Sequence, residues 1–183
     1  MDTRAKILKL TDHLIRDKGF NAFSFYDISK TIGIKTASIH YHFPSKCDLG
    51  VALLKLHTEK VKELKEKTST KSPERKLEAF LSIYSKSKQE GKVCIVGSLA
   101  TDLNSVDKKI AKELKILAAE ILIWVTEILE EGKKKKVFYF DLPARTKALL
   151  IISAMLAALQ ISRLTNDKDF TLIKQSVIND LKK

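Results

Sequence analysis

The segment from Ser24 to Lys46 limits the possible folds more than any other part of the chain, because it predicts two short helices around a tight turn. Ser24 and Asp27 have the spacing of a capping box, which would begin the first helix. Gly33 can adopt the positive φ of the turn, and Thr36 then begins the second helix. Two helices joined in this way form a helix-turn-helix.

The second of these helices is expected to present a polar and aromatic outer face. If Ile39 points inward, a rotation of about 100° per residue turns Ala37 and Tyr41 outward. Ser38 and His40 then flank this outward pair. A short helix with such a face has the dimensions and chemistry to enter a groove of duplex DNA.

This segment resembles the TetR (tetracycline-repressor-like) family of bacterial transcriptional regulators. The resemblance lies in Gly33-Ile34, in the run from Ile39 to Phe43, and in Pro44-Ser45-Lys46 followed by Leu49. It implies an all-helical homodimer with an N-terminal DNA-binding domain and a larger C-terminal domain that binds an effector. Many members carry tyrosine at the position of His40, so this position departs from the usual pattern.

The resemblance also implies roles for individual side chains. It assigns contact with base edges to Thr36, Ala37 and His40, and the Ala37 methyl can meet a thymine methyl. It assigns contact with phosphates to Ser24, Tyr26, Ser38, Tyr41, His42 and Lys46. Tyr41 as an exposed aromatic, and His40 and His42 as surface residues that bind nothing, remain alternatives. A metal site is not expected, because residues two apart on a helix do not face one ion.

Composition agrees with an all-α fold. The 183 residues include only six glycines and three prolines, and helix-favouring Lys, Glu, Leu, Ile and Ala are abundant. With the resemblance, this predicts a three-helix helix-turn-helix domain over residues 1–47 and a larger helical domain for effector binding and dimerisation over residues 48–183.

The chain is basic, with a net charge of +12, which favours polyanionic partners. Residues 1–50 contain eight basic and five acidic side chains, so most of the excess lies in the C-terminal part. Lys30, Lys35 and Lys46 around the helix-turn-helix are therefore better indicators of DNA binding than the total charge. Residues 133–136, four lysines, are interpreted as a solvated loop, with a second nucleic-acid or membrane contact as the alternative.

Apolar residues at helical spacing predict the other helices, over residues 2–18, 45–68, 72–90 and 105–131, with Gly132 ending the last. The helix over 45–68 begins at a second capping box, Ser45 and Asp48, and is long enough to connect the two domains. Residues 94–103 resemble a short helix that lies beside the effector cavity in some members of the family.

The effector pocket is predicted only from the placement of residues on the presumed cavity helices. The residues are Leu81, Tyr84, Leu99, Ile121, Trp124, Val125 and Met155. For Trp124 a place in the core is the alternative. The resemblance implies a small molecule, and these side chains would suit an apolar or amphipathic one.

Residues 148–161 are the most apolar stretch of the chain, yet shorter than the roughly 20 residues of a membrane span. A helix that is apolar on nearly every side must be buried, in one subunit or between two. With the last helix, Phe170 to Leu181, it predicts a homodimer interface of four helices. A core within one subunit is the alternative.

An enzyme is not expected. The chain has no P-loop, dinucleotide fingerprint, H-E-x-x-H or G-x-S-x-G, and we expect neither catalytic residues nor a cofactor. Cys47 and Cys94 have no motif partner, and the N-terminus does not resemble a signal peptide. These features favour a cytoplasmic protein that does not bind membranes.

The sequence therefore predicts a regulator that binds double-stranded DNA as a homodimer. We expect a repressor released from a palindromic operator by a small apolar or amphipathic effector. The alternative is an effector-independent DNA-binding protein of the same fold, with an architectural or partner-recruiting role.

Overall fold

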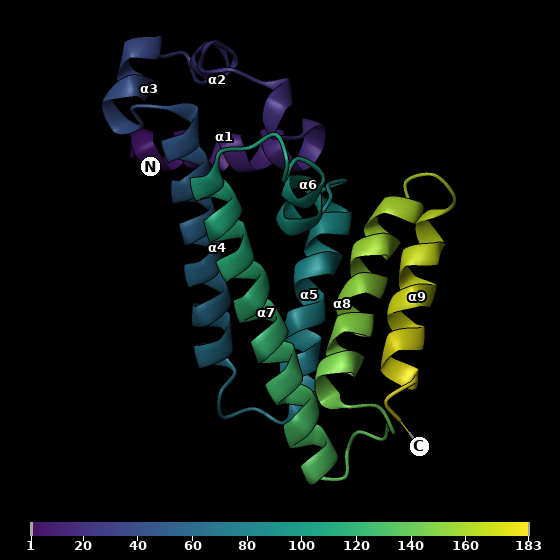
Figure 1. Cartoon of the computed structure of the whole chain (residues 1–183). Helices are drawn as coiled ribbons and strands as arrows, with labels where there is room; N and C mark the ends of the chain where they lie inside the picture. Colours follow the sequence, from purple (N-terminus) through teal and green to yellow (C-terminus); the bar gives the residue numbers. More distant parts are fainter. Residues whose placement is uncertain (1, 183) are drawn as a thin grey trace. The chain divides into compact units, whose positions relative to one another are not determined.

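The structure, a computed structural model, describes residues 2–182, which form nine α-helices and one short 3₁₀ helix and contain no strand (Figure 1). The predicted all-α class is confirmed. The helices are α1 (Thr3–Lys18), η1 (Phe20–Ala22), α2 (Phe25–Ile32), α3 (Thr36–His42), α4 (Lys46–Lys67), α5 (Pro73–Gln89), α6 (Ile95–Thr101), α7 (Lys108–Lys134), α8 (Ala144–Ile161) and α9 (Asp167–Asn179).

The described chain divides into two compact units. Unit 1 comprises the residues up to Glu59 together with Ile95–Ala118, and unit 2 comprises Lys60–Cys94 and the residues from Ala119 onward. Helices α4 and α7 each contribute residues to both units. The domain boundary predicted after residue 47 falls inside α4 and stays a prediction.

Unit 1 carries the helix-turn-helix on a small apolar core. Helix α1 packs against α2, α3 and α6. Ile7 and Ile15 of α1, Ile28 of α2 and Ile39 of α3 are completely buried. The inward face of each short helix is thus set by one or two isoleucines, and their burial supplies the main favourable free energy of this unit.

Short hydrogen bonds join α6 and the turn after it to the end of α1 within unit 1. Ser98 Oγ donates to the Ile15 carbonyl at 2.7 Å. The Phe20 amide donates to the Asp102 carboxylate at 3.1 Å, and the Asn21 amide to Ser105 Oγ at 2.9 Å. The segment from 98 to 105 therefore adds hydrogen bonds both to the end of α1 and to η1.

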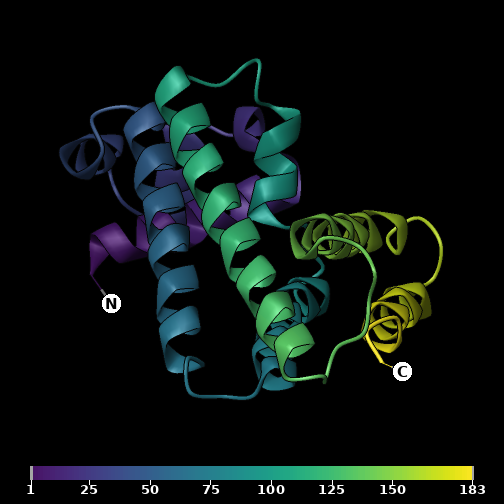
Figure 2. The same cartoon turned by 60° about the horizontal axis from the view of Figure 1, so that its bottom comes forward.

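Unit 2 contains α5, α8 and α9 with the later parts of α4 and α7. Helices α8 and α9 lie side by side, and α5 packs against α8 (Figures 1 and 2). Polar contacts also join α5 to α9: Lys88 pairs with Asp167 at 2.5 Å, and Lys174 donates to Ser85 at 2.8 Å. Unit 2 is therefore a helical bundle held by both apolar and polar contacts.

The predicted end of a helix at Gly132 is wrong, because α7 continues through this residue to Lys134. Gly132 is buried, and a Cβ atom there would lie 2.0 Å from Cδ2 of Phe138. The amides of Val137 and Phe138 both donate to the Gly132 carbonyl. The glycine lets the Phe138 ring approach the helix closely.

The predicted loop over 133–136 is wrong for its first two lysines, because α7 includes them. All four lysines are exposed.

The last helix begins at Asp167, earlier than the predicted Phe170. Asn166 is its cap and accepts the Lys168 amide at 2.9 Å, and Asp169 accepts the Asn166 amide in return. This pair forms a capping box, which starts the helix three residues before its first buried residue.

Helix α8 has the length and apolar composition of a membrane-spanning helix, with a mean hydropathy of 1.5. The core helix of a soluble protein can meet the same criteria. Only 33% of α8 is buried in the single chain, so much of its apolar surface remains accessible.

Candidate nucleic-acid interface

The start of α2 is fixed by the predicted capping box, which is confirmed. The Asp27 amide donates to Ser24 Oγ at 3.4 Å, and the Ser24 amide donates to the Asp27 carboxylate at 2.7 Å. The Ser24 hydroxyl also donates to this carboxylate, and these hydrogen bonds lower the pKa of Asp27. Two free amides of the first turn are thereby satisfied, and the negative charge lies at the positive end of the helix.

The turn between α2 and α3 depends on Gly33. This residue has φ 77° and ψ 37°, a left-handed conformation that side chains disfavour. The amides of Gly33 and Ile34 both donate to the Ser29 carbonyl, at 2.9 and 3.1 Å, and so end α2. Thr36 at the start of α3 donates to Ser29 Oγ at 3.2 Å, which ties the two helices together.

The buried and exposed sides of helix α3 are those predicted from its sequence. Ile39 is completely buried, whereas Ala37, Ser38, His40 and Tyr41 are exposed. Tyr41 is 85% exposed, the value of a side chain that packs against almost nothing in its own chain. An aromatic residue held in solvent on a short rigid helix is available for an external partner.

The remaining residues assigned to DNA contact lie close by. Thr36 and His42 are half-buried at the two ends of α3. Ser24 is exposed at the N-terminal end of α2, and Tyr26 is 66% exposed on its first turn. Unit 1 thus brings the predicted side chains of α2 and α3 to one small region of its chain.

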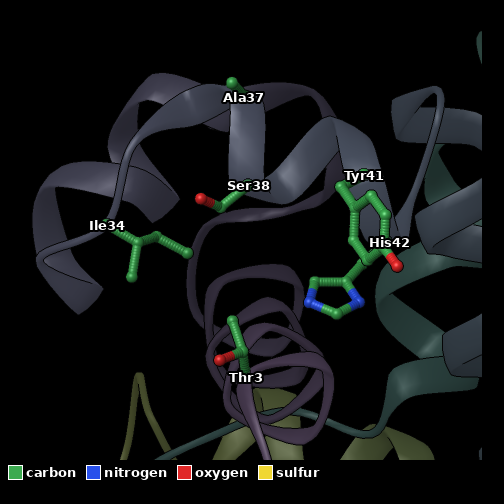
Figure 3. Close-up of a pocket in the computed structure, with 6 residues that line it drawn as sticks. All are labelled: Thr3, Ile34, Ala37, Ser38, Tyr41 and His42. Carbon is green, nitrogen blue, oxygen red and sulfur yellow. The ribbon is translucent and has the colours of Figure 1, made fainter.

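A shallow depression of about 450 Å³ lies beside the outer face of α3 (Figure 3). Figure 3 shows Ser38 and His42 on one side of it and Thr3, from the start of α1, on the other. Its lining residues are Thr3, Ile34, Ala37, Ser38, Tyr41 and His42. The sequence analysis missed Thr3 and Ile34. No sequence pattern near Thr3 indicated a binding site, because Thr3 lies near α3 only as a result of α1 packing against α3.

Lys46 makes contacts inside its own unit. Its Nζ donates to the Phe23 carbonyl and lies 4.7 and 4.3 Å from the ring centres of Phe20 and Phe23. Burial lowers its pKa, although Asp27 and Asp102 oppose this effect. These contacts hold the first turn of α4 against the segment that precedes α2. Its predicted contact with a phosphate stays a prediction.

The first turn of α4 also has its predicted capping residues. The Asp48 amide donates to Ser45 Oγ at 3.1 Å, and Ser45 Oγ donates to the Asp48 carboxylate at 2.6 Å. These two hydrogen bonds fix the start of α4.

Most residues predicted for the effector pocket are buried. In unit 2, Phe80 stacks edge-to-face on Tyr84 and on Trp124, with ring centres 5.4 and 6.0 Å apart. Burial, with Cys94 nearby, raises the pKa of Tyr84. Leu81, Tyr84, Trp124, Val125 and Met155 are buried in unit 2, Ile121 is half-buried there, and Leu99 is buried in unit 1. Their role in binding an effector stays a prediction.

Neither metal nor disulfide chemistry is indicated within residues 2–182. Among these residues no group of three or more His, Cys, Asp or Glu side chains could hold a metal ion. Cys47 and Cys94 are free thiols, and burial raises the pKa of Cys47, with Asp107 adding to the effect.

Known proteins match both this segment and the whole chain. A family model for bacterial regulatory proteins of the tetR family matches residues 7–53. The crystal structure of a TetR transcriptional regulator from Legionella pneumophila is 34% identical, matches 100% of this chain and 98% of that one, and has a TM-score of 0.89. An HTH-type transcriptional regulator in the lacX 3′ region of Lactococcus lactis subsp. lactis is 28% identical over 96% of this chain and 93% of its own.

A more distant structure shares the fold. The transcriptional regulator FadR from Bacillus subtilis, solved in complex with stearoyl-CoA, is 18% identical, matches 96% of this chain and 95% of its own, and has a TM-score of 0.71. The family model covers α2, the Gly33 turn and α3, where the geometry described above lies. The similarity to the Legionella pneumophila regulator extends over the whole chain. This chain belongs to the TetR family of bacterial regulatory proteins and is a transcriptional regulator with a DNA-binding helix-turn-helix domain.

Proposed function

We propose that this regulator is a repressor that binds a palindromic operator as a homodimer and leaves it when a small apolar or amphipathic effector binds. The observation that carries the DNA-binding part is the outer face of α3, where Ala37 and Tyr41 are exposed while Ile39 is fully buried. A single short helix buries too little surface for high selectivity. Two such helices about 34 Å apart would read successive major grooves.

Within each subunit we divide the contacts by chemistry. Thr36, Ala37 and His40 meet base edges. Ser24, Tyr26, Ser38, Tyr41, His42 and Lys46 meet phosphates, which position the helix and carry little sequence information. Thr3, whose hydroxyl can donate, joins the phosphate side of this surface, since it lines the same depression as Ser38 and His42.

The test is selection of bound duplexes, from fragments of the source genome and from a random pool, followed by footprinting. We expect a palindrome whose half-site centres are one helical turn apart. Thr36→Val should change the preferred sequence, whereas Tyr41→Ala should weaken all sequences alike. A chain that selects no duplex, or selectivity that is unchanged in Thr36→Val, would count against the proposal.

We place the homodimer interface on α8 and α9. Leu164 is 87% exposed and Leu172 is 63% exposed, and other apolar side chains of α8 are also accessible. The accessible apolar residues are Leu149, Leu150 and Ile161 of α8, Leu172 of α9, and Leu164 in the turn between these helices. Several exposed apolar side chains on two helices that lie side by side support association with a second copy. The small side chains Ser153, Ala154 and Ala157 would let two helices approach closely.

For the effector we propose a site in unit 2 among Leu81, Tyr84, Ile121, Trp124, Val125 and Met155. The stearoyl-CoA complex of FadR supports an apolar or amphipathic ligand for this fold. Binding would shift α5 and with it α4, which runs from unit 2 into unit 1 and begins directly after the helix-turn-helix. The ligand must bind the DNA-free state more tightly, because equal affinity for both states would shift nothing.

Release is tested by screening amphipathic ligands for thermal stabilisation of the full chain and then measuring operator affinity with each one that binds. An inducing ligand lowers this affinity, and Trp124→Leu should weaken ligand binding. Operator affinity that stays the same with every bound ligand would favour the effector-independent protein of the same fold. We further propose a cytoplasmic location, which a chromosomal operator requires.

A further inference from the structure

We propose that His40 reads a base that presents an exocyclic amino group in the major groove, adenine or cytosine, through its Nε2 atom. This inference rests on the proposed function, because it concerns one residue of the DNA-contacting face. His40 is exposed on α3, adjacent to Tyr41 and one turn after Ala37.

Two contacts hold the imidazole of His40 in one orientation. Its Nδ1 lies 3.2 Å from the carbonyl oxygen of Pro44, just beyond the end of α3. The ring also meets the Phe25 ring edge-to-face, with centres 4.9 Å apart. Phe25 is the first residue of α2. Pro44 lies directly before Ser45, whose side chain accepts the Asp48 amide at the start of α4. Both contacts of the His40 ring therefore come from helix starts that hydrogen bonds fix in place.

The Pro44 contact also sets the tautomer. A carbonyl oxygen can only accept a hydrogen bond, so Nδ1 must carry the proton. In the neutral ring, Nε2 is then left with a lone pair and can only accept. Nε2, the ring nitrogen that Pro44 does not hold, is thus an oriented acceptor in the neutral ring.

Such an acceptor distinguishes the four bases by the groups that they present in the major groove. Adenine presents its N6 amino group and cytosine its N4 amino group, and both donate. Guanine presents N7 and O6, and thymine presents O4, which are acceptors and would face the Nε2 lone pair. An unpaired acceptor brought against another acceptor loses its hydrogen bond with water and gains none, so guanine and thymine are disfavoured at this position.

The experiment uses the full chain and the duplex that it selects from a random pool. His40→Phe keeps an aromatic ring against Phe25 but removes both nitrogens, and His13→Phe, at an exposed position of α1, is the matched histidine control. We expect one base pair of the half-site to be fixed in identity and orientation for the native chain, with its adenine or cytosine as the contacted base, and to lose this requirement in His40→Phe. Replacing that base by purine or 2-pyrimidinone, which lack the amino group, should weaken native binding about tenfold and leave His40→Phe binding within about twofold.

A second variant tests the opposite chemistry. Arginine carries donors only, so His40→Arg should move the preference at the same position to guanine. The inference is overturned if removing the amino group from the adenine or cytosine of this pair leaves native binding unchanged, or if no position changes in His40→Phe or His40→Arg. If the native chain selects no duplex at all, the proposed function fails as well, and the two failures are thereby distinguished. If His40→Phe does not fold, the inference is tested by two other results: binding of the native chain to the duplexes that lack the amino group, and the base preference of His40→Arg.

Discussion

His57 Nε2 on α4 lies 2.6 Å from Asp12 Oδ1 on α1, and Arg16 meets the other Asp12 oxygen at 3.1 Å. Asp12 is thus shared between its own helix and α4 within unit 1. Burial alone would raise its pKa, but the hydrogen bond and charge of His57 and the charge of Arg16 together lower it to about 2. The contact connects the first helix of the DNA-binding domain to the helix that continues into unit 2.

The low pKa of Asp12 predicts a loss of stability in acid. Its folded pKa of about 2 lies below the ordinary 3.8, so its contribution is fully present above about pH 4 and is lost as the pH falls through 2. Over this window the free energy of unfolding of the native chain should fall by on the order of 2 kcal/mol more than that of Asp12→Asn. Urea unfolding at a series of pH values measures the difference. Asp17→Asn, at an exposed position of α1, should follow the native chain; identical curves for Asp12→Asn and the native chain would contradict the prediction.

Lys46→Met should lower both stability and DNA affinity. The variant leaves the Phe23 carbonyl without its donor and removes a cation from two aromatic rings, which costs about 1–2 kcal/mol of unfolding free energy. If Lys46 also meets a phosphate, the slope of log affinity against log salt becomes shallower by about 0.9, equally for all sequences. Chemical unfolding and binding at several salt concentrations measure the two effects. Lys55→Met, at an exposed position of α4, is the control; an unchanged salt slope would remove Lys46 from the phosphate contacts.

Gly132→Ala should destabilise unit 2 through the Phe138 ring. The added Cβ would lie 2.0 Å from Cδ2 of this ring, so either the ring or the helix must move, at a cost of about 1–3 kcal/mol. The same substitution made in a Phe138→Leu background should cost much less, because the ring that causes the clash is absent. Thermal unfolding of the four chains measures this coupling. Equal costs in both backgrounds would show that the clash is not the cause.

If the chain forms the proposed homodimer, Leu150→Glu should convert it to a monomer. Leu150 is 53% exposed on α8, within the surface assigned to the interface, and a buried carboxylate there costs on the order of 2 kcal/mol per subunit. The dimer dissociation constant should rise roughly a thousandfold. Sedimentation velocity over a concentration series measures it. Ile123→Glu, at a similarly exposed position of α7, should leave the oligomeric state unchanged; a Leu150→Glu chain that remains dimeric would place the interface elsewhere.

The elements that sequence analysis predicted best are those held by contacts between residues close in the chain. The capping box of Ser24 with Asp27 and the hydrogen bonds between Ser45 and Asp48 close over three residues, and the Gly33 amide donates back to the Ser29 carbonyl. Their partners stand within one turn of a helix, so spacing alone identifies them. The outward facing of Ala37 and Tyr41 followed from the same helical period.

Gly132 and Thr3 illustrate the opposite case. A glycine near the end of an apolar repeat has the same sequence signature whether it ends the helix or admits a neighbour, and only the Phe138 ring distinguishes the two. Thr3 lies 35 residues before Ser38, and the two share a depression only because α1 packs against α3.

By itself the sequence determined the helix-turn-helix, its capping residues and the outward face of α3, since these depend on backbone geometry and hydrogen bonds within a few residues. Only the tertiary structure decided what each side chain can offer a partner. The imidazole of His40 is oriented by a ring from α2 and a carbonyl beyond α3, and Lys46 donates to the backbone of Phe23. Such contacts form when separate helices pack, because the groups that satisfy a polar side chain are then supplied by residues that its own helix does not contain.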